Sequence, residues 1–159
     1  MTILQAQQLP YPRLIGIVGN PRAGKTLAQT ILGELGGYLP VDDAAPLRQF
    51  TIAQLGMSHD DVYTQEGKAG HVEILGKTWQ RRDILGTLGV HLEEMFGEFI
   101  LPWLAIRDLD PAKRYCFGGV RKNQGHFYRQ HGAIIIEIQN PLAPPSPYKF
   151  DRYNRAAID

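Results

Sequence analysis

A glycine-rich stretch directly after a short apolar run is the feature that most constrains the fold of this chain. The apolar run covers residues 14–18, and residues 19–26 then read G-N-P-R-A-G-K-T, which fits the spacing G-x-x-x-x-G-K-T. This spacing is typical of a tight loop between a strand and a helix, in which backbone N–H groups and the helix N-terminus surround phosphate oxygens. The stretch therefore predicts a phosphate-binding loop.

Individual residues of this loop have distinct expected roles. Gly19 and Gly24 let the backbone approach a ligand closely. Lys25 is expected to reach the β and γ phosphates of ATP, and the Thr26 hydroxyl is expected to bind Mg²⁺. The residues expected to contact the nucleotide are Gly19, Asn20, Pro21, Arg22, Ala23, Gly24, Lys25, Thr26 and Leu27. The alternative is a strand-to-helix turn that binds no ligand, but the helical spacing of apolar residues over 27–35 favours the binding loop.

Alternation of strands and helices is predicted along most of the chain. Apolar, β-branched runs predict strands near 13–18, 38–41, 114–117 and 133–138. Helical spacing predicts helices near 24–35 and 45–55, two or three helices within 79–106, and one that runs to residue 130. Such alternation favours an α/β fold of the three-layer P-loop NTPase type, with a mainly parallel central sheet and helices on both faces.

Two segments interrupt this alternation. Residues 56–77 are polar and punctuated by glycine, so we expect a long loop or mobile insert there, within a substrate-binding insert near 56–105. Residues 140–147 contain four prolines and cannot form a helix; with the basic residues that follow, they are expected to form a lid-like tail over 140–159. A disordered basic tail is the alternative. With 159 residues, the chain is expected to form one domain.

The composition limits the classes of partner. A net charge of +1 gives no general attraction to nucleic acid or to anionic membranes, and neither a leader peptide nor an apolar run of membrane-spanning length is recognisable. Cys116 is the only cysteine, so we expect no internal disulfide and a cytoplasmic setting, which would be the host cytoplasm if a phage encodes the protein. The histidines show no metal-ligand spacing. A homodimer is left open.

Charged residues elsewhere supply candidates for the acceptor site. Asp42 and Asp43 follow the predicted strand 38–41, so they are expected at the same sheet edge as the loop. There, a carboxylate could hold magnesium-bound water or orient an acceptor phosphate, with Asp42 as a substrate ligand and Asp43 in catalysis. An acidic turn without function is the alternative. Arginines bind phosphate in bidentate fashion, and the candidates for substrate contact are Arg48, Arg82, Arg121 and Arg152.

Several segments, taken in order, resemble the phage-type deoxynucleoside monophosphate kinases, which are related to dephospho-coenzyme A kinases. They are the loop with its strand, A-A-P-L-R at 44–48, R-D-I-L-G-T-L-G at 82–89, Trp103, Val120-Arg121 and Asp151. Those enzymes use Mg²⁺ and transfer the γ-phosphate of ATP to a deoxynucleoside monophosphate. The resemblance implies that Lys25 and Thr26 serve ATP and magnesium, and that Arg82 and Arg121 serve substrate phosphate and transition-state charge.

The chain departs from the family's pattern at two acidic positions. Ala45 and Gly119 stand where the family has acids, and Asp42 or Asp43 is the candidate substitute. The family's Thr-Pro before Arg82 is Gln80-Arg81 here. Three hypotheses follow: a kinase that acts on a (deoxy)nucleoside monophosphate, a nucleotide-binding protein that has lost catalysis, and a P-loop kinase with another acceptor such as dephospho-coenzyme A.

Overall fold

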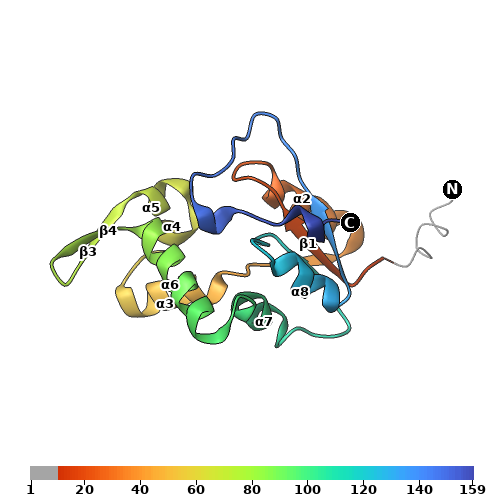
Figure 1. Cartoon of the computed structure of the whole chain (residues 1–159), viewed down its shortest axis with the longest axis horizontal. Helices are drawn as coiled ribbons and strands as arrows, with labels where there is room; N and C mark the ends of the chain where they lie inside the picture. The colour runs from red at the N-terminus through yellow and green to blue at the C-terminus, as the bar shows by residue number, and fades with distance from the viewer. Residues whose placement is uncertain (1–10) are drawn as a thin grey trace. The chain divides into compact units, whose positions relative to one another are not determined.

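The computed structural model describes residues 11–159 and divides them into two compact units (Figure 1). We call residues 11–41 together with 109–159 the sheet unit, and residues 42–108 the inserted unit. The inserted unit thus interrupts the sheet unit in the sequence, directly after its second strand. The expected substrate-binding insert near 56–105 falls entirely inside residues 42–108.

The sheet unit is built on four parallel strands. These are β1 (Leu14–Val18), β2 (Tyr38–Val41), β5 (Arg114–Phe117) and β6 (Ala133–Glu137), in the order β2-β5-β1-β6. All four coincide closely with strands predicted from the sequence. The α/β class and the parallel sheet are therefore confirmed.

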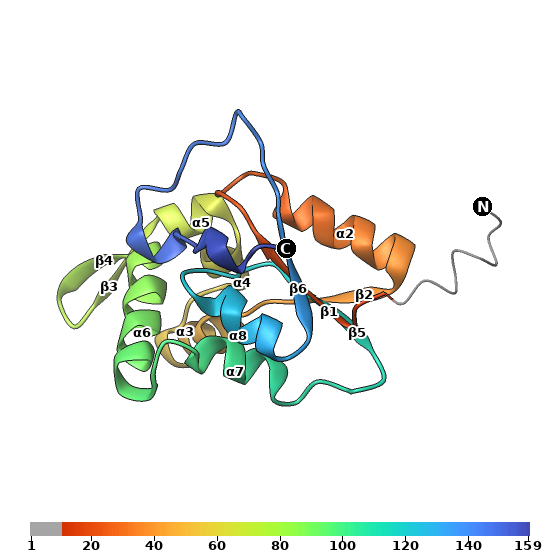
Figure 2. The ribbon, with the colours of Figure 1, turned by 45° about the vertical axis from the view of Figure 1, so that its right-hand side comes forward.

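Helices α2 (Lys25–Gly36) and α8 (Gln124–Gln130) flank this sheet on opposite faces (Figure 2). Alternation along β1 explains this arrangement, because successive side chains of a strand point to opposite faces. Ile15 and Ile17 pack beside Tyr38 and Cys116 on the face that α2 covers. On the other face, Phe117 stacks on Tyr128 of α8 with ring centroids 4.3 Å apart.

Two glycines have specific structural roles in this unit. A Cβ at Gly16, in the middle of β1, would lie 2.5 Å from Ile135 Cδ1, so the missing side chain lets β6 pack tightly against β1. Gly37 ends α2 in the left-handed region, with φ of 68°, and its N–H donates to Gly33 and Leu32 carbonyls. This is a common way to terminate a helix, because glycine adopts that conformation without steric cost.

Helices and one hairpin make up the inserted unit. The helices are α3 (Ala45–Leu55), α4 (His59–Tyr63), α5 (Gln65–Ala69), α6 (Arg81–Phe96) and α7 (Ile100–Ile106). The antiparallel hairpin consists of β3 (His71–Ile74) and β4 (Lys77–Gln80). Met57, Val62 and Ile84 form the buried centre of this unit.

The expectation of a long loop at 56–77 is wrong. This stretch contains α4, α5, β3 and the start of β4. Its helices have five residues each, too short for apolar periodicity to show in the sequence. They are defined instead by capping: Ser58 accepts a hydrogen bond from the Asp61 N–H, and Thr64 accepts one from the Gly67 N–H.

The expected helical stretch from 79 to 106 needs correction at its start. Residues 79–80 are the end of β4, and the chain then forms two helices, in agreement with the two or three expected. Gly89 is buried within α6, and a Cβ there would lie 3.4 Å from Leu47 Cδ1. Gly97 ends α6, with φ of 99°. Pro102 lies in the first turn of α7, where a missing N–H costs no helical hydrogen bond.

The C-terminal tail, residues 138–159, is attached to the sheet unit. No helix forms in the proline-rich part, as expected, but 3₁₀ turns occur at Lys149–Asp151 and Arg155–Ala157. The Asp159 N–H donates to Ile135 O, and its carboxylate accepts a hydrogen bond of 2.7 Å from the Ile135 N–H. The tail thus covers the outer edge of β6.

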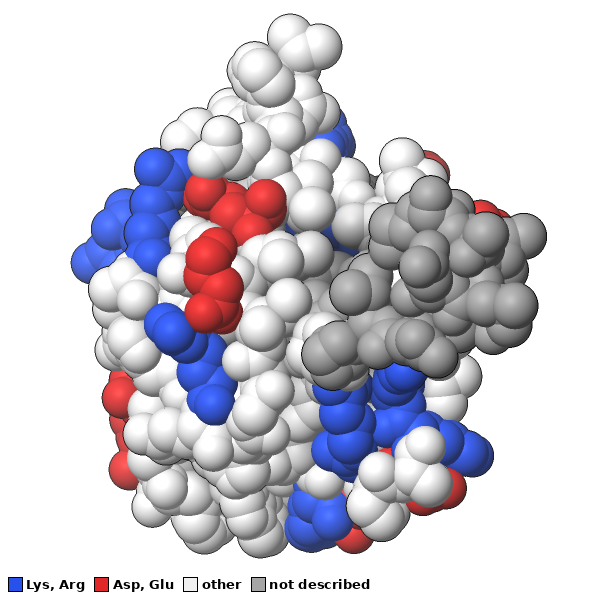
Figure 3. All heavy atoms as spheres, turned by 90° about the vertical axis from the view of Figure 1, so that its right-hand side faces the viewer, with Lys and Arg blue, Asp and Glu red and all other residues white. Residues whose placement is uncertain are grey.

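Surface charges of both signs occur together. On the face shown in Figure 3, groups of basic side chains have acidic side chains beside them. Among the helices of residues 11–159, none is both long enough and apolar enough to cross a membrane.

Ile17 provides a direct test of the sheet core. Its side chain is fully buried at the centre of β1, so Ile17→Ala is expected to lower the free energy of unfolding by about 2–5 kcal/mol, through lost burial and the cavity left behind. Ile134→Ala on β6 is the matched control, because Ile134 is 38% exposed and should cost at most about 1–2 kcal/mol. Urea unfolding measures both. Equal losses would contradict the described packing.

Candidate functional site

The glycine-rich loop lies at a topological switch point, where the helices that follow two neighbouring strands cover opposite faces of the sheet. Helix α2 follows β1 on one face, α8 follows β5 on the other, and β1 and β5 are neighbours. In parallel sheets, ligands bind outside the carboxyl ends of the strands at such a switch point. Residues 19–24 connect β1 to α2 at this edge. The loop predicted from the sequence is therefore in the position that a ligand-binding loop of an α/β sheet occupies.

The backbone of the loop depends on its glycines. A Cβ at Gly19 would lie 2.7 Å from Ile138 O, because the segment after β6 runs against the loop. Gly24 precedes α2 with φ of 108°, and no side chain caps the helix N-terminus. Arg22 also has a positive φ, of 63°. The first N–H groups of α2 therefore have no side-chain acceptor from the described residues, which is the arrangement that suits an anionic ligand.

Lys25 turns back onto its own loop. Its Nζ donates to Gly19 O at 2.7 Å and to Asn20 O at 2.9 Å. Burial lowers the pKa of Lys25, the nearby charge of Arg121 lowers it further, and Asp151 acts in the opposite direction. The ammonium group is thus held at the loop by carbonyl oxygens, beside a second cation and a carboxylate.

Thr26 is exposed in the first turn of α2. Its hydroxyl is a hard oxygen donor of the kind that Mg²⁺ prefers. Among residues 11–159, no cluster of three or more His, Cys, Asp or Glu side chains could hold a metal ion. The Thr26 hydroxyl, together with the oxygens of a bound phosphate, could contribute to a magnesium site here.

Arg121 reaches this region from the end of β5. Its backbone N–H donates to Gln124 Oε1 at 3.0 Å, and Gln124 is itself buried. The Arg121 Nε lies 3.4 Å from Asp151 Oδ1, and the Ser146 hydroxyl donates to Asp151 Oδ2 at 2.7 Å. Sequence reasoning gave Asp151 no role beyond the family resemblance, because a single acid in a basic tail looks like a solvated residue.

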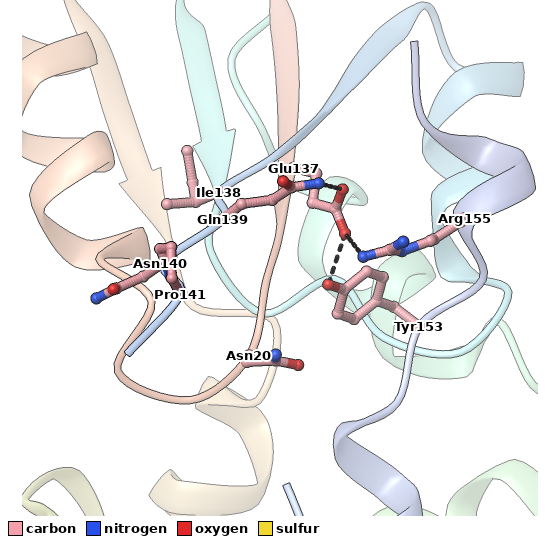
Figure 4. Close-up of a pocket in the computed structure, with 8 residues that line it drawn as sticks. All are labelled: Asn20, Glu137, Ile138, Gln139, Asn140, Pro141, Tyr153 and Arg155. Carbon is pink, nitrogen blue, oxygen red and sulfur yellow. Dashed lines mark hydrogen bonds and ion pairs between the residues drawn. The ribbon is translucent and has the colours of Figure 1, made fainter. Parts of the chain in front are cut away.

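A pocket of about 220 Å³ lies beside the loop (Figure 4). Its walls come from the loop, from the end of β6 and the segment after it, and from the tail: Asn20, Glu137, Ile138, Gln139, Asn140, Pro141, Tyr153 and Arg155. It thus lies at the carboxyl end of β6, next to the loop. The sequence did not indicate it, because its walls are separated along the chain.

Glu137 is the polar centre of this pocket. Gln139 Nε2 donates to Oε2 at 2.6 Å, whereas the Tyr153 hydroxyl and the Arg155 guanidinium both bind Oε1, at 2.8 Å and 3.0 Å. Figure 4 shows the three side chains converging on the carboxylate. The hydrogen bond from Gln139, with those from Tyr153 and Arg155, lowers the pKa of Glu137 against the opposing effect of burial.

The remaining charged candidates lie in the inserted unit or in the tail. Arg48 binds both carboxylate oxygens of Asp42 and donates to Val62 O at 3.1 Å. Asp43 is 3% exposed. Arg82 donates to Gln65 Oε1 at 2.7 Å. The structure therefore brings Asp42 and Arg48 together in one unit, and Lys25 and Arg121 together in the other.

Arg152, the last of the substrate candidates, lies in the tail. Its backbone carbonyl accepts a hydrogen bond from the Lys122 N–H, next to Arg121. The position of Arg152 is therefore fixed through its main chain, on the same side of the sheet unit as the ion pair of Arg121.

Comparison with known proteins adds no homologue. No protein-family model matches the chain, and no curated protein is significantly similar to it in sequence. The chemistry of the site is therefore inferred from its geometry.

Acidification tests the role of Glu137. Because the folded protein has a lowered Glu137 pKa, this carboxylate adds stability above the ordinary glutamate pKa and loses it as the pH falls through the folded value. Glu137→Gln should lower the free energy of unfolding by roughly 1–3 kcal/mol at pH 7. The difference from wild type should shrink in acid.

Urea unfolding at pH 7 and at about pH 3 measures this dependence. Glu34→Gln is the matched control, since Glu34 is an exposed residue of α2 in the same unit. A Glu137→Gln penalty that stays constant with pH would show that the carboxylate's charge does not attach the tail.

Proposed function

We propose that this protein is a magnesium-dependent nucleotide kinase that transfers the γ-phosphate of ATP to a (deoxy)nucleoside monophosphate. The observation that carries the proposal is the loop of residues 19–26. It combines the G-x-x-x-x-G-K-T spacing, a place at the carboxyl end of β1, an uncapped α2 and a lysine held at the loop. Each of these features favours a bound polyphosphate.

ATP would bind with its phosphates on the loop and on the first N–H groups of α2. Lys25 would exchange Gly19 O and Asn20 O for the β and γ phosphate oxygens, an exchange that needs only rotation of its side chain. The magnesium ion that accompanies ATP supplies charge neutralisation between the phosphates, with the Thr26 hydroxyl as the protein ligand.

Transfer itself requires positioning and charge neutralisation more than covalent chemistry. An oxygen of the acceptor phosphate would form the new bond to the γ-phosphorus as the bond to ADP breaks. Arg121 would stabilise the charge that spreads over the transferred group, since its guanidinium lies in the same charged cluster as Lys25. The family resemblance at 82–89 supports Arg82 as a ligand of the acceptor's phosphate.

A nucleotide-binding protein without catalysis is the second candidate, and particular contacts favour it. Ala45 and Gly119 replace acids of the resembled family. The Asp42 carboxylate accepts hydrogen bonds from Arg48, and Asp43 is almost fully buried. Neither candidate acid is therefore freely available to a metal ion. An enzyme with another acceptor, such as dephospho-coenzyme A, is the third.

ADP formation from MgATP tests the proposal, with each common deoxynucleoside monophosphate and with dephospho-coenzyme A as acceptors. We expect turnover with at least one monophosphate. Lys25→Ala should reduce kcat by about 100-fold or more, because it removes a positive charge from the transferred phosphate. Lys113→Ala, an exposed lysine of the same unit, is the control and should leave the rate unchanged.

The results separate the three hypotheses. Lys25-dependent ATP binding without turnover would favour the binding protein, and turnover with dephospho-coenzyme A alone would identify the other acceptor. Equal ATP binding by wild type and Lys25→Ala would contradict all three.

The two arginines are expected to differ in their kinetic effects. Arg121→Ala should lower kcat by about 100-fold or more, because charge on the transferred group develops mainly in the transition state. Arg82→Ala should chiefly raise KM for the acceptor, because it would remove a contact present before transfer. Arg107→Ala, an exposed arginine that pairs with Asp108, is the control. Steady-state kinetics measures all three, and identical effects at 82 and 121 would overturn the assignment.

A further inference from the structure

A carboxylate of the C-terminal tail lies beside the two cations of the proposed phosphate site. The Asp151 side chain is only 10% exposed, and its Oδ1 is 3.4 Å from the Arg121 Nε. The Ser146 hydroxyl donates to its other oxygen, and the Asp151 N–H donates to Tyr148 O. Asp151 is thus held by its own segment with its carboxylate toward Arg121.

While no anion is bound at the loop, the Asp151 carboxylate stabilises the two cations electrostatically. The charge of Arg121 lowers the pKa of Lys25, so the two cations repel each other, and Lys25 is partly removed from water. A nearby carboxylate offsets both costs. A polyphosphate brings several negative charges to the same two cations, so it would repel Asp151 and compete with it for Arg121.

The tail is attached differently on the two sides of Asp151. After it, the Asn154 N–H donates to Lys122 O, and the side chains of Tyr153 and Arg155 bind Glu137. Ala157 is buried, and Asp159 pairs with Ile135. Before it, the chain runs through the proline-rich segment 140–147. Loss of the Arg121 contact would therefore remove a charged anchor of residues 146–151, while the contacts of residues 153–159 would be kept.

We propose that Asp151 is an internal counter-ion of the phosphate site, which a bound polyphosphate replaces on Arg121. This inference rests on the proposed binding of a nucleotide at residues 19–26. It gives the tail a specific role: residues 146–151 report whether the phosphate site is filled, and they move when it fills.

Calorimetric titration with MgATP tests the inference, using Asp151→Asn, which removes the charge and keeps the shape. Without the competing carboxylate, the variant should bind MgATP roughly tenfold more tightly at low salt, and added salt should reduce the difference. Asp159→Asn is the matched control. Asp159 is also a tail carboxylate paired with an arginine, Arg129, and its replacement should leave the affinity unchanged.

Lys25→Ala, included in the same titrations, separates failure of the inference from failure of the proposed function. Unchanged or weaker binding by Asp151→Asn, with binding that still requires Lys25, would overturn the counter-ion alone. Wild-type binding that does not require Lys25 would overturn the proposed function and the counter-ion together.

Hydrogen exchange of the wild-type protein provides a second readout that does not depend on any variant. MgATP should increase amide exchange in residues 146–151 and leave residues 153–159 unchanged. Protection of 146–151 by MgATP would mean that the segment closes over the nucleotide, and it would overturn the proposal.

Discussion

Parallel pairing of β1 with β5 on one side and with β6 on the other is the constraint on which the candidate site depends. Because the three strands run in the same direction, the chain leaves each of them at one edge of the sheet. Beyond β1 lies the loop 19–26, beyond β5 lies Arg121, and beyond β6 lies the pocket around Glu137. The Ile138 N–H, which donates to Val18 O at 2.8 Å, continues this pairing past the last residue of β6. A strand slip of one residue would separate groups that come from distant parts of the sequence.

Ion pairs and hydrogen bonds connect the tail to this edge. Asp151 binds Arg121, and Glu137 binds Tyr153 and Arg155. The two carboxylates lie on opposite sides of this contact. Asp151 belongs to the tail and pairs with a cation that follows β5, whereas Glu137 belongs to β6 and binds two side chains of the tail. Buried charges are stable only when they are paired. The tail therefore supplies charged and hydrogen-bonding partners for the groups at this edge.

The fold could be predicted from sequence wherever a segment is long and regular. The strands 14–18 and 133–137 are runs of apolar and β-branched residues, and α2 has apolar residues at helical spacing between the glycine-rich loop and Gly37. Residues 56–77 were mispredicted as a loop, because α4 and α5 are single turns stabilised by caps and β3 is half exposed. Local capping of that kind specifies structure without producing a periodic apolar pattern.

The sequence by itself determined the glycine-rich loop between β1 and α2 and predicted phosphate binding there, because the motif consists of neighbouring residues: small residues that free the backbone, and a lysine and a threonine at the start of a helix. It also indicated Arg121 as a candidate for phosphate contact. Only the tertiary structure decided which carboxylates accompany these cations. It placed Asp42 against Arg48 inside the inserted unit, and it brought Asp151 to Arg121 across thirty positions of the chain. Contacts between distant residues leave no spacing to recognise, so folding alone selects the partner of each charge.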